Sequence, residues 1–131
     1  MLKPSIGTLA GDRLWPMPMK PGRLGYVEAA MHRWIERGVE ALIEFIGPEV
    51  EWHPHDSDRS MRGPEVLDRV QALEAGGVTR RARDPKFKEL PDCVLVNVAA
   101  RDYHTHGFLE SRRTLRFEFA GDTLVRVRSL G

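Results

Sequence analysis

Three polar side chains of the sequence could carry acid/base chemistry on a small molecule: His53, Asp102 and Arg113. An imidazole or a carboxylate can accept a proton, and a guanidinium stabilises the negative charge that develops on an oxygen atom. An enzyme with His53 or Asp102 as base and Arg113 as anion-binding group would act on a small, partly apolar compound by general acid/base catalysis. The alternative is a non-catalytic ligand-binding or dimerisation module, in which Asp102 and Arg113 form a structural ion pair.

The spacing of Asp102 and Arg113 follows from the hairpin that joins their strands. Glycine at the second central position of a two-residue turn favours a turn over His106 and Gly107, with Thr105 opposite Phe108. Counting back from this turn gives the pairs His104 with Leu109, Asp102 with Ser111, Ala100 with Arg113, Val98 with Leu115, Val96 with Phe117 and Val94 with Phe119. Opposed residues share a face of the sheet. We therefore expect Asp102, His104 and Arg113 on the apolar face that helices cover, where polar groups must satisfy one another or line a cavity.

Aromatic and histidine side chains add candidate ligand contacts. The residues expected to contact a ligand are Trp34, Trp52, His55, His104 and Phe117. Two His-x-His patterns, at 53–55 and 104–106, have the spacing of metal ligands on a strand, which leaves a metal site as a remote alternative. Pro54 interrupts the first pattern, and His106 falls in the predicted turn of the second. The sequence therefore predicts no metal and no cofactor.

The elements that position these side chains are three helices followed by strands. Helical spacing begins at Tyr26, breaks near Gly38 and stops at Gly47-Pro48, and a third helix begins at Gly63-Pro64 and ends at Gly76-Gly77. The third helix is expected to bury the stripe Val66, Leu67, Val70 and Leu73. Strands are predicted at 50–53, weakly within 80–90, and at 93–104, 108–119 and 122–130. This order indicates an α+β fold with an antiparallel meander.

Composition limits the class of protein. The chain has 131 residues, one cysteine and a formal net charge of +1, which predicts one domain and no nucleic-acid or membrane partner. Residues 1–25, rich in proline and glycine, are expected to form an extended arm before a single domain at 26–131. Without a signal peptide or an apolar spanning segment, the expected location is the cytoplasm.

Two further expectations concern the strand that begins at Cys93. Leu95 and Ala99 make this strand apolar on its second face too, which predicts a homodimer formed through the outer face of the sheet. Cys93 itself has no partner in the chain and no sequence signature of a nucleophile around it. We therefore expect a buried structural thiol.

Several short motifs, in a fixed order, carry a family resemblance. They are Glu36-Arg37-Gly38 between two helices, GPEVEWHP at 47–54, RGPEVL at 62–67, and AGDTLVRVRSL at 120–130 after the strand RRTLRFEF. With them, the run from Tyr26 to Leu130 resembles the nuclear transport factor 2-like superfamily and its SnoaL-like polyketide cyclase branch. The resemblance implies a cone-shaped, cystatin-like α+β fold, in which a curved antiparallel sheet wrapped by three N-terminal helices encloses a pocket and the outer face of the sheet forms a dimer.

Members of this superfamily include ketosteroid isomerases, polyketide cyclases and epoxide hydrolases. Where a ketosteroid isomerase has its general-base aspartate, this sequence has Trp52 or His53. Near the position of its hydrogen-bonding acid stands Arg113, and the tyrosine of its first helix is absent from the region of Met31. The resemblance therefore implies pocket positions, and it does not imply ketosteroid isomerisation.

Overall fold

Three helices come first in the structure, a computed structural model that describes residues 22–54 and 59–130. They are α1 (Gly22–Arg37), α2 (Val39–Ile46) and α3 (Gly63–Ala75). Gly38, with a φ of 97°, separates α1 from α2, and Gly47, with a φ of 93°, ends α2. Both breaks confirm the sequence prediction, because this backbone region is favourable for glycine and costly for other residues. The first helix begins at Gly22 rather than Tyr26, so helix replaces the last part of the expected arm. The rest of that arm lies outside the described residues.

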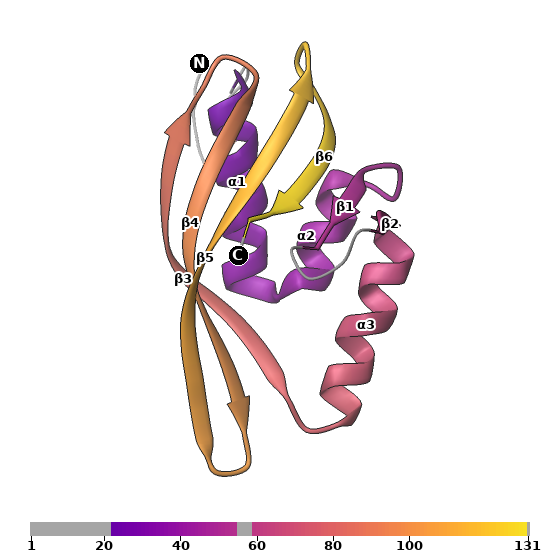
Figure 1. Cartoon of the computed structure of the whole chain (residues 1–131), viewed down its shortest axis with the longest axis vertical. Helices are drawn as coiled ribbons and strands as arrows, with labels where there is room; N and C mark the ends of the chain where they lie inside the picture. Colours follow the sequence, from indigo (N-terminus) through magenta and orange to yellow (C-terminus); the bar gives the residue numbers. More distant parts are fainter. Residues whose placement is uncertain (1–21, 55–58, 131) are drawn as a thin grey trace, which may run out of the picture.

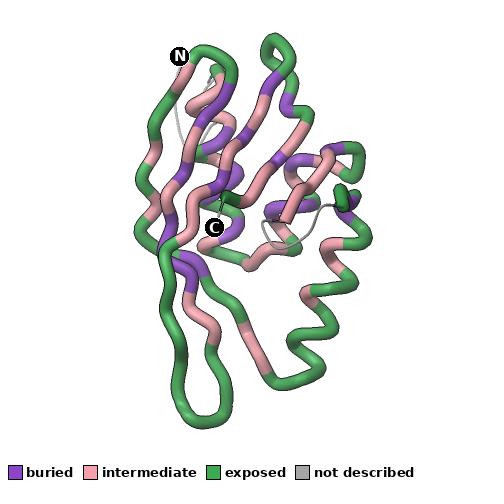
Figure 2. Tube along the Cα trace, in the orientation of Figure 1, coloured by how far each residue is buried: buried purple, intermediate pink, exposed green. Residues whose placement is uncertain are grey.

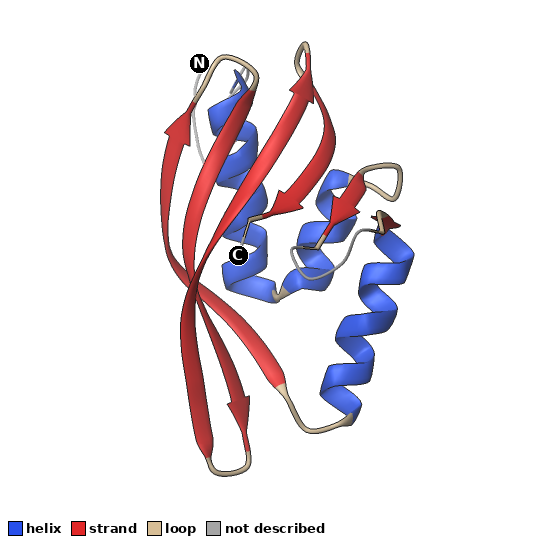
Figure 3. Ribbon diagram, in the orientation of Figure 1, coloured by secondary structure: helices blue, strands red, loops and turns tan. Residues whose placement is uncertain are grey.

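Six strands form one sheet against these helices (Figure 3). They are β1 (Glu51–His53), β2 (Met61–Arg62), β3 (Thr79–Glu89), β4 (Cys93–His104), β5 (Gly107–Ala120) and β6 (Thr123–Ser129), in the spatial order β2-β1-β6-β5-β4-β3. Strands β3 to β6 form the predicted antiparallel meander, while β1 pairs with β6 in parallel. The α+β architecture predicted from the sequence is confirmed.

One face of the sheet, called the inner face below, packs on α1 and α2 around the apolar core. The sheet residues of this core are Ala82, Val94, Val96, Val98, Leu115, Phe117, Phe119, Leu124 and Val127. The helices contribute Val27, Ala30, Met31, Trp34, Leu42 and Ile46. Figure 2 shows buried chain in the upper part of β4 and β5, whereas the hairpin that projects downward from them is exposed. The core therefore occupies one end of the sheet, and the hairpin end extends beyond it.

The hairpin between β4 and β5 differs from the predicted register. His104 lies opposite Gly107, so the two turn residues are Thr105 and His106, and every pair shifts by two positions from the prediction. Asp102 faces Leu109 rather than Ser111, and Arg113 faces Val98 rather than Ala100. The glycine, with a φ of 138°, occupies the first strand position after the turn instead of a central turn position. A shift of two preserves the alternation of faces, so the predicted composition of the inner face is nevertheless correct.

The apolar stripe of α3 is also less covered than predicted. In α3 only Gly63 is buried; Val66, Leu67 and Val70 are half-buried and Leu73 is 40% exposed. Figure 1 shows the reason, since α3 lies beside β2 and extends down past α2, away from the long strands. Helices α1 and α2 thus cover the core, and α3 contributes its first turn.

Candidate functional site

Arg113 occupies the inner face of the sheet, directly opposite Val98 on β4 and two residues before the buried Leu115 on β5. Its side chain is half-buried, and the Nε atom is buried without a hydrogen-bond partner among residues 22–54 and 59–130. Within the described ranges the guanidinium forms no ion pair. An arginine keeps its positive charge in proteins and offers only donors, so this position calls for an acceptor or an anion.

Two tryptophans approach the same core from other elements. Trp34, on α1, is 8% exposed, and Trp52, on β1, is half-buried against the core. The Nε1 atom of each indole is buried and has no hydrogen-bond partner among the described residues. Trp52 lies on the inner face, because it is paired with Val127, which is itself paired with Phe117.

The position of Trp34 along the strands can be derived from the hydrogen bonds that fix the start of α1 against the sheet. Arg23, at the start of α1, donates hydrogen bonds to the carbonyl oxygens of Pro91 and Gly121, at the upper turns of the sheet. Trp34 comes about 16 Å further along the helix, at about 1.5 Å per residue. The same distance along β4 from Pro91, at about 3.3 Å per residue, reaches Val96. Helix α1 packs against β3 and β4 (Figure 1), and Trp34 belongs to the same core cluster as Val98, the residue opposite Arg113.

Asp102 is bound by an arginine other than the predicted one. Arg80 on β3, which lies opposite Asp102, donates hydrogen bonds from Nε and Nη2 to the two carboxylate oxygens, at 2.7 and 2.9 Å. The ion pair between Asp102 and Arg113, which the alternative of a non-catalytic module invoked, is therefore not formed. The hydrogen bond from Arg80 holds the pKa of Asp102 below its ordinary value, and the charges of Arg80 and Arg113 lower it further. A carboxylate with a lowered pKa is a weaker base.

The histidines do not meet at Arg113. His53 is paired with Arg128, and Glu51, two residues earlier on β1, is paired with Arg126. Because alternate residues of a strand share a face, His53 lies on the outer face of the sheet with these three residues. His104 ends β4 at the exposed hairpin, where its Nδ1 accepts a hydrogen bond from the backbone N–H of His106 at 3.4 Å. His55 lies outside the described residues. The structure therefore brings Trp34, Trp52 and Arg113 to the inner side, and it separates His53 from them.

Phe117, a predicted ligand contact, is completely buried in the core. Its side chain packs against protein and supports the sheet between Val94 and Val127. Its role in the structure is that of a core residue, and the side chain offers no surface from which to contact a ligand.

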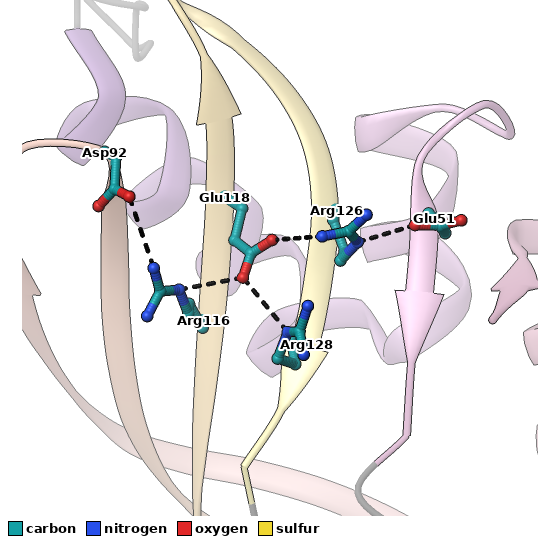
Figure 4. A network of polar contacts seen from close by, with 6 residues as sticks. All are labelled: Glu51, Asp92, Arg116, Glu118, Arg126 and Arg128. Carbon is teal, nitrogen blue, oxygen red and sulfur yellow. Dashed lines mark hydrogen bonds and ion pairs between the residues drawn. The ribbon is translucent and has the colours of Figure 1, made fainter. Parts of the chain in front are cut away.

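The outer face carries a network of charged residues (Figure 4). The carboxylate of Glu118 forms ion pairs with three arginines. The nitrogen-to-oxygen distances are 3.0 Å for Arg116, 2.9 Å for Arg126 and 3.3 Å for Arg128. Glu51 extends the network through Arg126 at 2.7 Å, and the resulting hydrogen bond lowers the pKa of Glu51. The signal in the sequence was the alternation of charges on β5 and β6, but their pairing across strands needed the register.

Other parts of the described structure offer fewer groups that could bind a ligand or react. Among residues 22–54 and 59–130, no three potential metal-ligating side chains come together. A hollow of about 260 Å³ on the exposed side of α1 is lined by His32, Arg33, Glu36 and Arg37, all on one helix. No helix in the described part of the chain has the length and hydropathy needed to cross a membrane.

Comparison with solved structures shows the nuclear transport factor 2-like fold. A candidate polyketide cyclase from Xanthomonas campestris pv. campestris has a TM-score of 0.66 and 13% identity, covering 82% of this chain and 87% of its own. A protein of this fold and unknown function from Burkholderia pseudomallei K96243 has a TM-score of 0.65 and 14% identity, with 85% and 90% covered. TerC, co-crystallised with polyporic acid, has a TM-score of 0.62 and 15% identity, with 84% and 90% covered. No family model and no curated protein matches the sequence.

Proposed function

We propose that this chain binds a small, partly apolar organic molecule between the inner face of its sheet and helix α1, with Arg113 as the anchor. The observation that carries the proposal is the half-buried guanidinium of Arg113, which has no ion pair within the described residues although it stands among apolar neighbours. A ligand that brings an acceptor to this guanidinium would remove the cost of its incomplete solvation. Trp34 and Trp52 would contact the body of the ligand.

Two solved structures of this fold were obtained with small organic molecules, which supports a small-molecule ligand here but does not identify it. The neighbour TerC was co-crystallised with polyporic acid, and a ketosteroid isomerase-like protein from Catenulispora acidiphila DSM 44928 was crystallised in complex with trimethylamine. Both are small organic molecules, of opposite chemical character. The class of ligand for this chain must therefore come from its own side chains.

Catalysis on the bound ligand would need a base close to Arg113. Asp102 is the carboxylate available as a base on the inner face near Arg113, and its bonds to Arg80 reduce its basicity. His53 would have to act from the outer face, next to Arg128. We therefore propose ligand binding as the primary function, with isomerisation, cyclisation or hydrolysis by general acid/base catalysis dependent on Asp102.

A thermal-shift screen with small carbonyl compounds, lactones and epoxides tests binding. Compounds that raise the melting temperature of the wild type should do so equally for Arg81→Met and much less for Arg113→Met. Arg81 is the matched control, because it is an exposed arginine of the same sheet, paired with Arg101 on the outer face. Equal stabilisation of both variants, or no stabilisation of the wild type by any compound, would refute Arg113 as the anchor.

A homodimer through the outer face stays a prediction. Ala99, one of the two apolar residues on which this prediction was based, is only 2% exposed in the single chain. Arg112 covers it: this side chain crosses from β5 to the carbonyl oxygen of Asp84 on β3 and donates a further hydrogen bond, at 2.6 Å, to Asn97. Sedimentation equilibrium decides between a monomer and a dimer.

A further inference from the structure

The unsatisfied polar atoms on the inner side of the protein are all hydrogen-bond donors. They are Nε1 of Trp34, Nε1 of Trp52 and Nε of Arg113, each buried without a partner in the part of the chain that the structure describes. An indole N–H and a guanidinium N–H cannot accept hydrogen bonds, so the three groups cannot satisfy one another. Buried donors in proteins are nearly always paired with an acceptor from the protein, from water or from a ligand.

The carboxylate that shares the inner face with Arg113 is bound to another arginine. Asp102 shares the inner face with Arg113, and both of its oxygens accept hydrogen bonds from Arg80. Arg113 acts on Asp102 only through its charge, without an ion pair. A cationic or donor-rich ligand would therefore meet a guanidinium and two indole N–H groups, with the nearby carboxylate engaged elsewhere. The electrostatic match is an anion.

The surroundings of these donors are apolar. Val98 lies opposite Arg113, Leu115 follows it on the inner face, and Met31 precedes Trp34 by one turn of α1. The three donors also come from three different elements: α1, β1 and β5. A single carboxylate cannot reach across all of these elements, so a matching ligand would carry acceptors at more than one position of an apolar body.

We infer that the ligand class is an organic carboxylate whose oxyanion binds at Arg113 and whose apolar body carries at least one further acceptor oxygen for the indole N–H of Trp34 or Trp52. This inference rests on the proposed function and narrows it from small organic molecules to acids of this kind. It also assigns the two tryptophans a polar role in addition to packing.

Four related compounds test the inference. The reference probe is 4-oxo-4-phenylbutanoate, which has a phenyl ring, a ketone and a carboxylate. Its primary amide removes the charge, 4-phenylbutanoate removes the ketone, and 4-phenylbutylamine replaces both by a cation. Calorimetric titration of the wild type should give the reference probe the highest affinity, with the amide weaker by about tenfold or more. In Arg113→Met this preference for the anion should disappear, and in the matched control Arg81→Met it should remain.

The indole N–H groups provide a readout that does not depend on affinity. In a proton–nitrogen correlation spectrum, the Nε1 signals of Trp34 and Trp52 can be assigned with the variants Trp34→Phe and Trp52→Phe. The reference probe should move at least one of these signals downfield, because its ketone oxygen accepts a hydrogen bond from the indole N–H. The same signal should move much less with 4-phenylbutanoate, which has no ketone. A purely packing role for the tryptophans would give similar shifts with both compounds and would overturn the second part of the inference.

The outcomes separate the inference from the proposed function. If the amide or the amine binds as tightly as the carboxylate and depends on Arg113, the small-molecule function stands and the oxyanion class is wrong. If none of the four probes binds while the wider screen yields neutral compounds, the oxyanion class is again wrong. If neither the probes nor the screen yields a compound that binds, the proposed function and the inference both fall.

Discussion

Arg80 and Asp102 form a bidentate pair across strands β3 and β4, with Nε and Nη2 at 2.7 and 2.9 Å from the two carboxylate oxygens. Arg80 is thus the partner of Asp102, in place of the Arg113 that one alternative from the sequence paired with it. Because Arg80 satisfies Asp102, Arg113 is left for another acceptor. The division of roles between the two arginines is therefore the structural basis for treating Arg113 as a ligand anchor.

The pair should make stability depend on acidity in a defined direction. The pKa of Asp102 lies below its ordinary value of 3.8 in the folded protein, so the folded state favours the ionised form. Its stabilising contribution is complete above about pH 5 and is lost as the pH falls through 3.8 toward the lowered pKa. Since both side chains are about one-third exposed, we expect Asp102→Asn to lower the free energy of unfolding at neutral pH by about 0.5 to 1 kcal/mol.

Urea denaturation of wild type and Asp102→Asn between pH 3 and pH 7 measures this contribution. The difference between the two proteins should be present at neutral pH and should shrink in acid. A difference that is constant over the whole range would show that the loss comes from packing. Arg113→Met serves as the control, since it leaves the bidentate bonds of Asp102 in place and should lower stability less than Asp102→Asn does.

Much of the fold follows from local patterns, as β4 and β5 illustrate. Strict alternation of Val94, Val96 and Val98 identifies the inner face whatever the hairpin register, because a shift of two positions preserves the face. The partner of Asp102 could not be predicted in the same way. This partner, Arg80, lies on β3, a strand with few apolar residues and an irregular register between Arg83 and Lys86. The pairing of Arg80 with Asp102 therefore cannot be obtained by counting residues in the sequence.

The histidines show the same limit for the site. A three-residue strand such as β1 has too short a pattern to reveal which of Trp52 and His53 faces inward. Only the parallel pairing with β6 places Trp52 beside Val127 and His53 beside Arg128. The faces of Trp52 and His53 thus depended on a pairing between segments far apart in the chain, which hydrophobic periodicity does not encode.

Glu118 should contribute more to stability than its position on the outer face suggests. Its carboxylate separates three guanidinium groups, and its side chain is only 18% exposed. Replacing it with alanine leaves Arg116, Arg126 and Arg128 to repel one another, and we expect a loss of about 1 to 2 kcal/mol in the free energy of unfolding. The loss should be larger at low ionic strength, because salt screens the repulsion.

Glu110→Ala is the matched control for Glu118→Ala. Glu110 lies on the same strand and the same face, but it pairs with one arginine, Arg101. Glu110→Ala should lower the free energy of unfolding by less than Glu118→Ala does, and this loss should depend less on salt concentration. Equal losses for the two variants at every salt concentration would contradict a cooperative role for the network around Glu118.

Cys93 is expected to behave as a structural thiol. It is completely buried at the start of β4, and burial raises the pKa of its thiol, which lowers the fraction of reactive thiolate at neutral pH. A thiol reagent should therefore modify the native protein much more slowly than the protein unfolded in urea. Rapid modification of the native protein, at the rate found for the unfolded chain, would contradict this structural role.

The position of α3 depends on a close approach at its first residue. A Cβ atom added at Gly63 would lie 2.8 Å from Cγ2 of Ile43, a branched side chain buried in α2, and 3.5 Å from Cα of Pro48. Gly63→Ala should therefore force Ile43 or the start of α3 to move, with a loss of about 1 to 3 kcal/mol in the free energy of unfolding. Gly76→Ala, at the other end of α3, is the control, because the nearest atoms to its Cβ would be at ordinary distances of 3.5 and 3.6 Å. Chemical denaturation of both variants measures the difference, and a Gly63→Ala variant as stable as Gly76→Ala would show that α3 is free to shift against α2.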